Sequence, residues 1–197
     1  MVGFDLDMTL IDPRAGVVAT LAAVSAETGV RIDGELVASR LGPPLEVELA
    51  HWFPAAEVPA AADLYRALYP AYAIPLTTAL PGAVDAVALV RASGARAVVV
   101  TAKQHALAVS SLDAVGIPAD DVVGWRWGPA KGETLREHGA TAYVGDHTAD
   151  VDGARVAGAV SVAVASGPCS AEDLRAYGAD VVLAHLGEFA AWWRMAG

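Results

Sequence analysis

The chain has 197 residues, 55% of them hydrophobic, and a formal net charge of −10 at pH 7. This length fits one domain, or a core with a small insertion, and the apolar share suffices for a buried core. No apolar run approaches the roughly 20 residues that a membrane-spanning helix requires. The acidic balance argues against general nucleic-acid binding, which depends on clustered cations.

The single cysteine and the N-terminus bear on location. Cys169 has no intramolecular partner, as is typical of proteins from a reducing compartment. The first residues resemble neither a secretory signal nor a transit peptide. We therefore expect a cytoplasmic protein, a monomer or a homodimer, with no membrane and no nucleic acid as partner.

Residues 14–77 contain helix patterns only. Apolar residues recur at helical spacing over 16–28, and Gly29 follows as a stop signal. Asp33 can cap a helix over 34–39. Further helices are predicted after Pro43-Pro44 and over 57–72. With no strand pattern between them, these residues predict an all-helical unit inserted behind the first strand.

The rest of the chain alternates between strands and helices. A short buried strand is predicted at 2–4, followed by a loop or short hairpin over 9–14. Later strands are predicted at 97–101, 122–125, 142–145, 160–164 and 180–183. Helices are predicted at 83–92, 104–115, 131–138, 149–158, 171–176 and 187–195. Such alternation implies a parallel sheet with right-handed crossovers.

Two aspartates follow the first strand, where parallel sheets bind their ligands. Strand periodicity turns Asp5 and Asp7 to one side and Leu6 towards the core. Two close carboxylates repel unless a cation or a shared proton relieves them, which favours Mg²⁺ held by oxygen ligands. One carboxylate could then act as nucleophile and the other as general acid and base. A pair of solvated loop acids is the alternative for this motif alone.

Two further segments could bind an anion. The Thr101 hydroxyl and the backbone N–H groups near Ala102 lie at a strand end before a helix, which is a favourable anion site. Thr101 could instead be a helix cap. Lys131 stands at a helix start, where the macrodipole disfavours a cation, so that a bound anion would explain it. A solvated surface lysine is the alternative. The chain's only other lysine, Lys103, is expected to be peripheral.

A third acidic segment is Gly145-Asp146-His147-Thr148-Ala149-Asp150, at another strand end. If a helix starts near Ala149, both acids can face the same crevice. Asp146 is therefore a candidate metal ligand. Asp150 is expected to orient Lys131 or the water around the metal, although it could be only a first-turn helix acid.

Taken together, Asp5-Leu6-Asp7-Met8-Thr9, Thr101, Lys131 and the segment 145–150 resemble, in order, four motifs of the haloacid dehalogenase-like (HAD) hydrolase superfamily. The resemblance implies an α/β fold, with a Rossmann-like parallel sheet covered by helices on both faces, from residues 1–13 and 78–197. Residues 14–77 would form the small helical cap. The segment 40–45 is similar to the cap of phosphoglycolate-phosphatase-like members, which makes Arg40 a candidate substrate contact.

The resemblance implies a phosphatase that hydrolyses a small phosphorylated metabolite in two steps. Asp5 would attack phosphorus, and Asp7 would protonate the leaving oxygen and then activate water. Thr101, Ala102 and Lys131 would hold the phosphoryl group. The implied Mg²⁺ ligands are Asp5, the main-chain carbonyl of Asp7, and Asp146, with Asp150 and Thr9 supporting them.

Other activities within the resembled superfamily are less consistent with these residues. An acid at Asp7 disfavours a dehalogenase, and the absence of lysine from 14–77 disfavours a phosphonate hydrolase that forms a Schiff base. A phosphohexose mutase would need a base in the cap, where His51 is the sole histidine. That activity, and a catalytically silent binding protein, are the alternatives.

Overall fold

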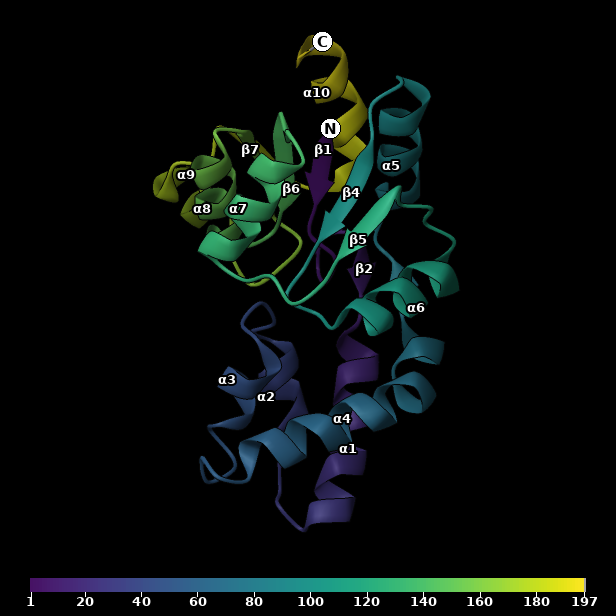
Figure 1. Cartoon of the computed structure of the whole chain (residues 1–197), viewed down its shortest axis with the longest axis vertical. Coiled ribbons are helices and arrows are strands. Elements are labelled where there is room, and N and C mark those ends of the chain that lie inside the picture. The colour runs from purple at the N-terminus through teal and green to yellow at the C-terminus, as the bar shows by residue number, and fades with distance from the viewer. Residues whose placement is uncertain (197) are drawn as a thin grey trace.

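The computed structural model describes residues 1–196 and has two parts, a sheet with its helices and a separate group of helices (Figure 1). The sheet has six parallel strands in the order β5-β4-β1-β6-β7-β8. Their bounds are β1 Val2–Phe4, β4 Ala97–Val100, β5 Asp121–Val123, β6 Ala142–Gly145, β7 Val160–Val164 and β8 Val181–Leu183. The predicted parallel α/β sheet is confirmed.

Helices cover both faces of this sheet, as predicted. One face packs on α5 (Ala83–Ala92), α6 (His105–Val115) and α10 (Phe189–Ala196). The other packs on α7 (Pro129–Glu137) and α8 (Thr148–Ala157), with α9 (Ala171–Tyr177) beside α8. A 3₁₀ turn, η2 (Leu186–Glu188), precedes α10. No helix within residues 1–196 is both long and apolar enough to cross a membrane.

The first strand shows why its residues suit the centre of the sheet. Val2 and Phe4 are fully buried against the face that carries α5 and α10. Gly3 points to the other face, where an added Cβ would lie 2.4 Å from Leu135 Cδ2 of α7. A side chain there would force Leu135 and Tyr143 to shift, so glycine suits the close packing on this face.

The helical part has a core of its own. It consists of α1 (Arg14–Thr28), α2 (Gly34–Ala38), α3 (Leu45–Leu49) and α4 (Val58–Tyr72), followed by the 3₁₀ turn η1 (Ile74–Leu76). Leu21, Leu49 and Tyr69 lie in this core, and Leu107 of α6 is the member that comes from the sheet part. Asp33 caps α2 as predicted, since its side chain accepts a hydrogen bond from Leu36 N.

The two parts are joined by a ribbon that the sequence pattern does not predict. Strand β2 (Ile11–Asp12) pairs antiparallel with β3 (Thr78–Ala79), so that the chain enters and leaves the helical part side by side. Each strand has only two residues, too few for a period-2 pattern to be recognised.

The fifth strand is shorter than the predicted range of 122–125. It ends at Val123, and Trp125 adopts a positive φ of 60° that a continuing strand does not allow. Gly124 between them packs so closely on α6 that an added Cβ would lie 2.4 Å from His105 N. The turn directs Trp125 towards the helical part of the molecule, where Arg66 lies over its ring.

Candidate active site

The strand register brings three of the predicted segments together. Phe4 pairs with both Val99 and Val144, so that the chain leaves the three central strands at nearly the same level. Asp5, Thr101 and Asp146 follow those strands. All three are buried, with 8%, 2% and 2% of their surface exposed.

A tight turn after Asp5 determines where Asp7 lies. The Leu6 carbonyl accepts hydrogen bonds from Leu10 N (2.8 Å) and Ile11 N (3.1 Å), and the Leu6 side chain is fully buried in the core of the sheet part. Asp5 and Asp7 both line a pocket between the sheet and the helical part. The alternative of two solvated loop acids is therefore wrong for Asp5, although Asp7 is partly exposed.

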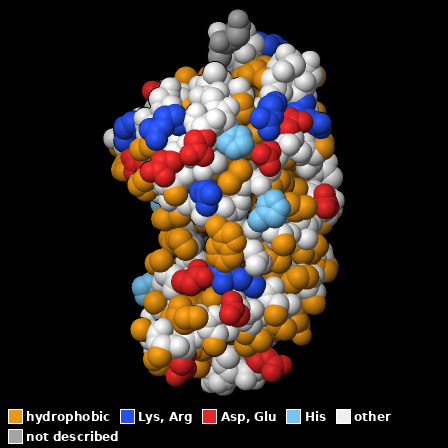
Figure 2. All heavy atoms as spheres, in the orientation of Figure 1, with side chains coloured by type: hydrophobic (Ala, Val, Ile, Leu, Met, Phe, Trp, Pro, Cys, Tyr) orange, Lys and Arg blue, Asp and Glu red, His pale blue; other side chains and the backbone are white. Residues whose placement is uncertain are grey.

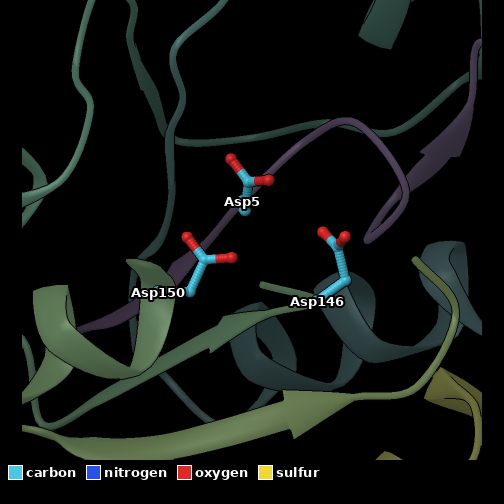
Figure 3. A group of neighbouring side chains, drawn as sticks. All are labelled: Asp5, Asp146 and Asp150. Carbon is cyan, nitrogen blue, oxygen red and sulfur yellow. The ribbon is translucent and has the colours of Figure 1, made fainter. Parts of the chain in front are cut away.

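Three buried carboxylates meet beneath this pocket. Asp5, Asp146 and Asp150 lie close together, and each offers an oxygen within 4.8 Å of the others (Figure 3). Asp150 lies in the first turn of α8, where its Oδ2 also accepts a hydrogen bond from His147 N. Thr9 donates from its hydroxyl to Asp146 Oδ1 at 2.8 Å.

Lys131 is the cation of this cluster. Its Nζ lies 2.8 Å from Asp5 Oδ1 and 2.7 Å from Asp150 Oδ1, and its side chain is only 1% exposed. The alternative of a solvated surface lysine is therefore wrong. Burial opposes the charge of Lys131, but the carboxylates of Asp150 and Asp5 outweigh burial and raise its pKa.

The cluster has more carboxyl groups than ammonium groups to neutralise them. Burial, together with the charge of Asp150, raises the pKa of Asp5 to about 7, although Lys131 acts against the shift. Burial and the charges of Asp5 and Asp150 raise the pKa of Asp146 well above its usual range. Three carboxylates against one ammonium suit a divalent cation, which prefers oxygen ligands. The donor set thus fits a metal such as Mg²⁺.

Thr101 and Lys103 line the same pocket as Asp5. Helix α6 begins after Gln104, so Thr101 is not its cap. The Thr101 hydroxyl instead accepts a hydrogen bond from Lys103 N at 3.2 Å. Lys103 Nζ donates to Asp7 Oδ1 and Oδ2 at 2.7 and 2.8 Å, and to the Tyr69 hydroxyl at 2.9 Å.

The contact between Lys103 and Asp7 contradicts the prediction that Lys103 is peripheral. Its side chain is 9% exposed; burial opposes its charge, but Asp7 and Tyr69 raise its pKa above the usual range. A sequence signal existed, because Lys103 is one of only two lysines and the other is Lys131. The sequence does not single out Tyr69 among the polar and aromatic residues of 14–77, whereas in the structure its hydroxyl binds Lys103 from α4.

The pocket itself is formed by both parts of the molecule. The sheet part contributes Asp5, Asp7, Thr101, Ala102, Lys103, Gln104, Leu107 and Trp125. The helical part contributes Val17, Leu21, Val37, Arg40, Leu41, Leu45, Glu46, Glu48, Tyr65, Arg66, Tyr69 and the segment 42–44. Arg40 thus lines the pocket, with its guanidinium bound by Glu48.

The two histidines considered from the sequence have different surroundings. His147 caps α8 through its ring, which accepts a hydrogen bond from Ala149 N, and it packs on Trp127 at 5.4 Å. Burial lowers the pKa of His147. His51 is exposed and is not part of the pocket.

Comparison with known proteins agrees with this geometry. The family described as haloacid dehalogenase-like hydrolase matches residues 2–155, and a second, described as HAD-hydrolase-like, matches residues 130–189. The protein named "Probable phosphatase IndB" of Dickeya dadantii (strain 3937) is 30% identical, covering 93% of this chain and 88% of that protein.

Solved structures show the same fold. A haloacid dehalogenase-like hydrolase family protein, SP0104 from Streptococcus pneumoniae, aligns with a TM-score of 0.84 at 24% identity, over 98% of this chain and 97% of the other. A structure described as a predicted phosphatase from Clostridium acetobutylicum aligns with a TM-score of 0.84 at 21% identity, over 98% and 97%. The chain therefore belongs to the haloacid dehalogenase-like hydrolase family, which confirms the resemblance of its motifs and the prediction of a hydrolase.

Proposed function

We propose that the chain is a Mg²⁺-dependent phosphatase that hydrolyses a small phosphomonoester through an aspartyl-phosphate on Asp5. In this proposal residues 1–13 and 78–197 form the catalytic domain, and residues 14–77 form a cap. The observation that carries it is the position of Asp5, which lines the pocket and also belongs to the buried carboxylate cluster. The relative from Dickeya dadantii, named as a phosphatase, supports the reaction type.

The two pocket aspartates would divide the chemistry. In the first step Asp5 forms a bond to phosphorus, the ester P–O bond breaks, and the leaving oxygen takes a proton from Asp7. In the second step water attacks the phosphorus and gives a proton to Asp7, while the bond between Asp5 and phosphorus breaks. Inorganic phosphate is released, Asp5 is again a carboxylate and Asp7 is again protonated. Lys103 holds Asp7 by both oxygens and so sets its orientation.

The phosphoryl group would be held by Thr101, the N–H of Ala102 and Lys131. In support, Thr101 and Ala102 line the same pocket as Asp5, and Lys131 contacts Asp5. Asp5, the main-chain carbonyl of Asp7 and Asp146 would hold Mg²⁺, with Thr9 and Asp150 orienting Asp146 and Lys131. When bound, the ion would supply positive charge against the phosphoryl oxygens.

The helical part would exclude water and contact the alcohol part of the substrate, and Arg40 would be one of its contacts. A location in the cytoplasm, and a monomeric or homodimeric state, stay predictions.

The alternatives are not favoured. A mutase needs a base in the cap, whereas His51 is exposed and outside the pocket. A silent binding protein would not need Asp5, Lys131 and Asp150 in direct contact beneath the pocket.

The experiment that tests the proposal measures phosphate release from p-nitrophenyl phosphate with Mg²⁺ and with excess EDTA. We expect turnover that EDTA abolishes and that Asp5→Asn lowers by about a thousandfold or more, because the nucleophile is lost. Asp152→Asn is the matched control, since Asp152 pairs with Arg155 on an exposed surface. Turnover that survives EDTA or Asp5→Asn would contradict the mechanism.

A further inference from the structure

The charged residues on the cap side of the pocket are paired with one another. Arg40 donates to Glu48 from Nε at 3.0 Å and from Nη2 at 2.6 Å. Arg66 donates to Glu46 from Nη2 alone, has Asp63 3.6 Å from its Nη1, and lies over the ring of Trp125, with 4.4 Å between its Cζ and the ring centre. Both arginines therefore already have a carboxylate partner within this wall of the pocket.

The third cation of the pocket is also engaged. The ammonium of Lys103 has three N–H donors. Its partners are the two oxygens of Asp7 and the hydroxyl of Tyr69. Among the described residues that line the pocket, no cation is left without a carboxylate partner.

The remaining wall is largely apolar. It is formed by Val17, Leu21, Val37, Leu41, Leu45 and Leu107, together with the rings of Tyr65 and Trp125. On the face shown in Figure 2, the cationic side chains of the lower half lie directly beside acidic ones among hydrophobic side chains. No large patch of one charge is seen there.

This balance limits what the alcohol part of a substrate can carry. A carboxylate or a second phosphate would meet arginines whose charge is already matched by Glu48 and Glu46, and would lose its hydration without gaining a counter-ion of its own. This is unfavourable, because a buried charge needs a partner. An uncharged apolar group avoids this cost and gains free energy by burying the apolar wall of the pocket.

We propose that the substrate is a monoester with a single phosphate, whose alcohol part is uncharged and mainly apolar or aromatic. This inference rests on the proposed phosphatase function and narrows it. Phosphorylated carboxylic acids and bisphosphates would then be poor substrates.

The test compares two substrates that differ in charge and hardly in shape, 4-carbamoylbenzyl phosphate and 4-carboxybenzyl phosphate. We expect kcat/KM to be at least about tenfold higher for the carboxamide, because its burial leaves no charge unpaired. Equal values, or a preference for the carboxylate, would overturn the inference.

Two variants sharpen the comparison by releasing an arginine. Glu48→Gln and Glu46→Gln should each raise kcat/KM for the carboxylate relative to the carboxamide, by about tenfold, because a guanidinium that has lost its glutamate then faces the substrate. In Glu46→Gln, Arg66 keeps only the longer contact with the exposed Asp63. The Glu46 side chain is 42% exposed, so this variant also serves if Glu48→Gln fails to fold. Asp152→Asn also removes one negative charge, but remote from the pocket, and should leave the ratio unchanged.

Binding separates this inference from the proposed reaction. The corresponding benzylphosphonates cannot be hydrolysed at the P–C bond by the proposed steps, and their affinity is measured by calorimetry in the presence of Mg²⁺. If the carbamoyl phosphonate binds more tightly but neither phosphate ester is hydrolysed, the phosphatase proposal is overturned and the preference for an uncharged alcohol part is supported. A preference for the carboxylate phosphonate would overturn the inference whether or not the protein turns over substrate.

Discussion

The two sides of the pocket differ in how their charges are paired: the buried cluster of Asp5, Asp146, Asp150 and Lys131 is its floor, and the helical part with Arg40 and Arg66 is its roof. Beneath it, Asp5, Asp146 and Asp150 are buried with Lys131 as their cation. Above it, Arg40 and Arg66 are each neutralised by a glutamate. Three carboxyls of the floor share one ammonium, whereas each arginine of the roof has its own glutamate. In the proposed reaction the unbalanced floor would bind the ion and the phosphoryl group, and the balanced roof would select an uncharged alcohol.

Removing the lysine of the floor should have the largest effect on stability. Lys131→Met leaves Asp5 and Asp150 buried without their partner, and we expect a loss of about 3–5 kcal/mol in the free energy of unfolding. Urea unfolding without metal measures this loss. Arg155→Met breaks an exposed pair with Asp152 and should cost no more than about 1 kcal/mol. Similar losses in the two variants would contradict the distinction between buried and exposed pairs.

Binding of Mg²⁺ should stabilise the floor in a pH-dependent way. The pKa of Asp5 is raised to about 7, so the metal-free fold favours the neutral carboxyl. The folding stability that this neutral carboxyl contributes is lost as pH rises through this value. Mg²⁺ needs the ionised carboxylates. We expect saturating Mg²⁺ to stabilise the fold by about 2–3 kcal/mol near pH 8 and by clearly less near pH 5.

Thermal unfolding at both pH values with and without Mg²⁺ measures this difference. Asp12 and Asp180 have lowered pKa values, and the stability that they contribute is lost only as pH falls below the ordinary aspartate pKa of about 4. They therefore do not change the comparison between pH 5 and pH 8. Asp146→Asn should remove most of the Mg²⁺ effect. An equal stabilisation at the two pH values would show that these carboxylates do not bind the ion.

The contact between floor and roof through Lys103 should have a smaller, selective effect. Lys103→Met removes the hydrogen bonds that orient the Asp7 carboxyl, and Tyr69→Phe removes one partner of Lys103. We expect Lys103→Met to lower kcat/KM for benzyl phosphate by about tenfold more than for p-nitrophenyl phosphate, because only the poor leaving group needs a well-placed acid. Tyr69→Phe should show the same preference more weakly. An equal loss for both esters would indicate a structural role alone.

Much of this fold could be predicted because its signals are local. Helical spacing in residues 16–28, the Asp33 cap and the alternation of strands and helices each depend on near neighbours, and the structure confirms them. The β2–β3 ribbon was missed because its two strands pair across the whole helical insertion. The end of β5 was missed because it depends on how closely Gly124 packs on α6.

The resemblance to the family, the parallel sheet and the acids at the strand ends could all be predicted from residue type and spacing. How the charges pair could not, and became visible only in the packed fold. It buried Lys131 between Asp5 and Asp150, brought Lys103 to Asp7, and neutralised Arg40 with Glu48. The physical reason is that an ion pair depends on distance and burial, and residues far apart in the chain acquire both only when the sheet and the helices have packed together.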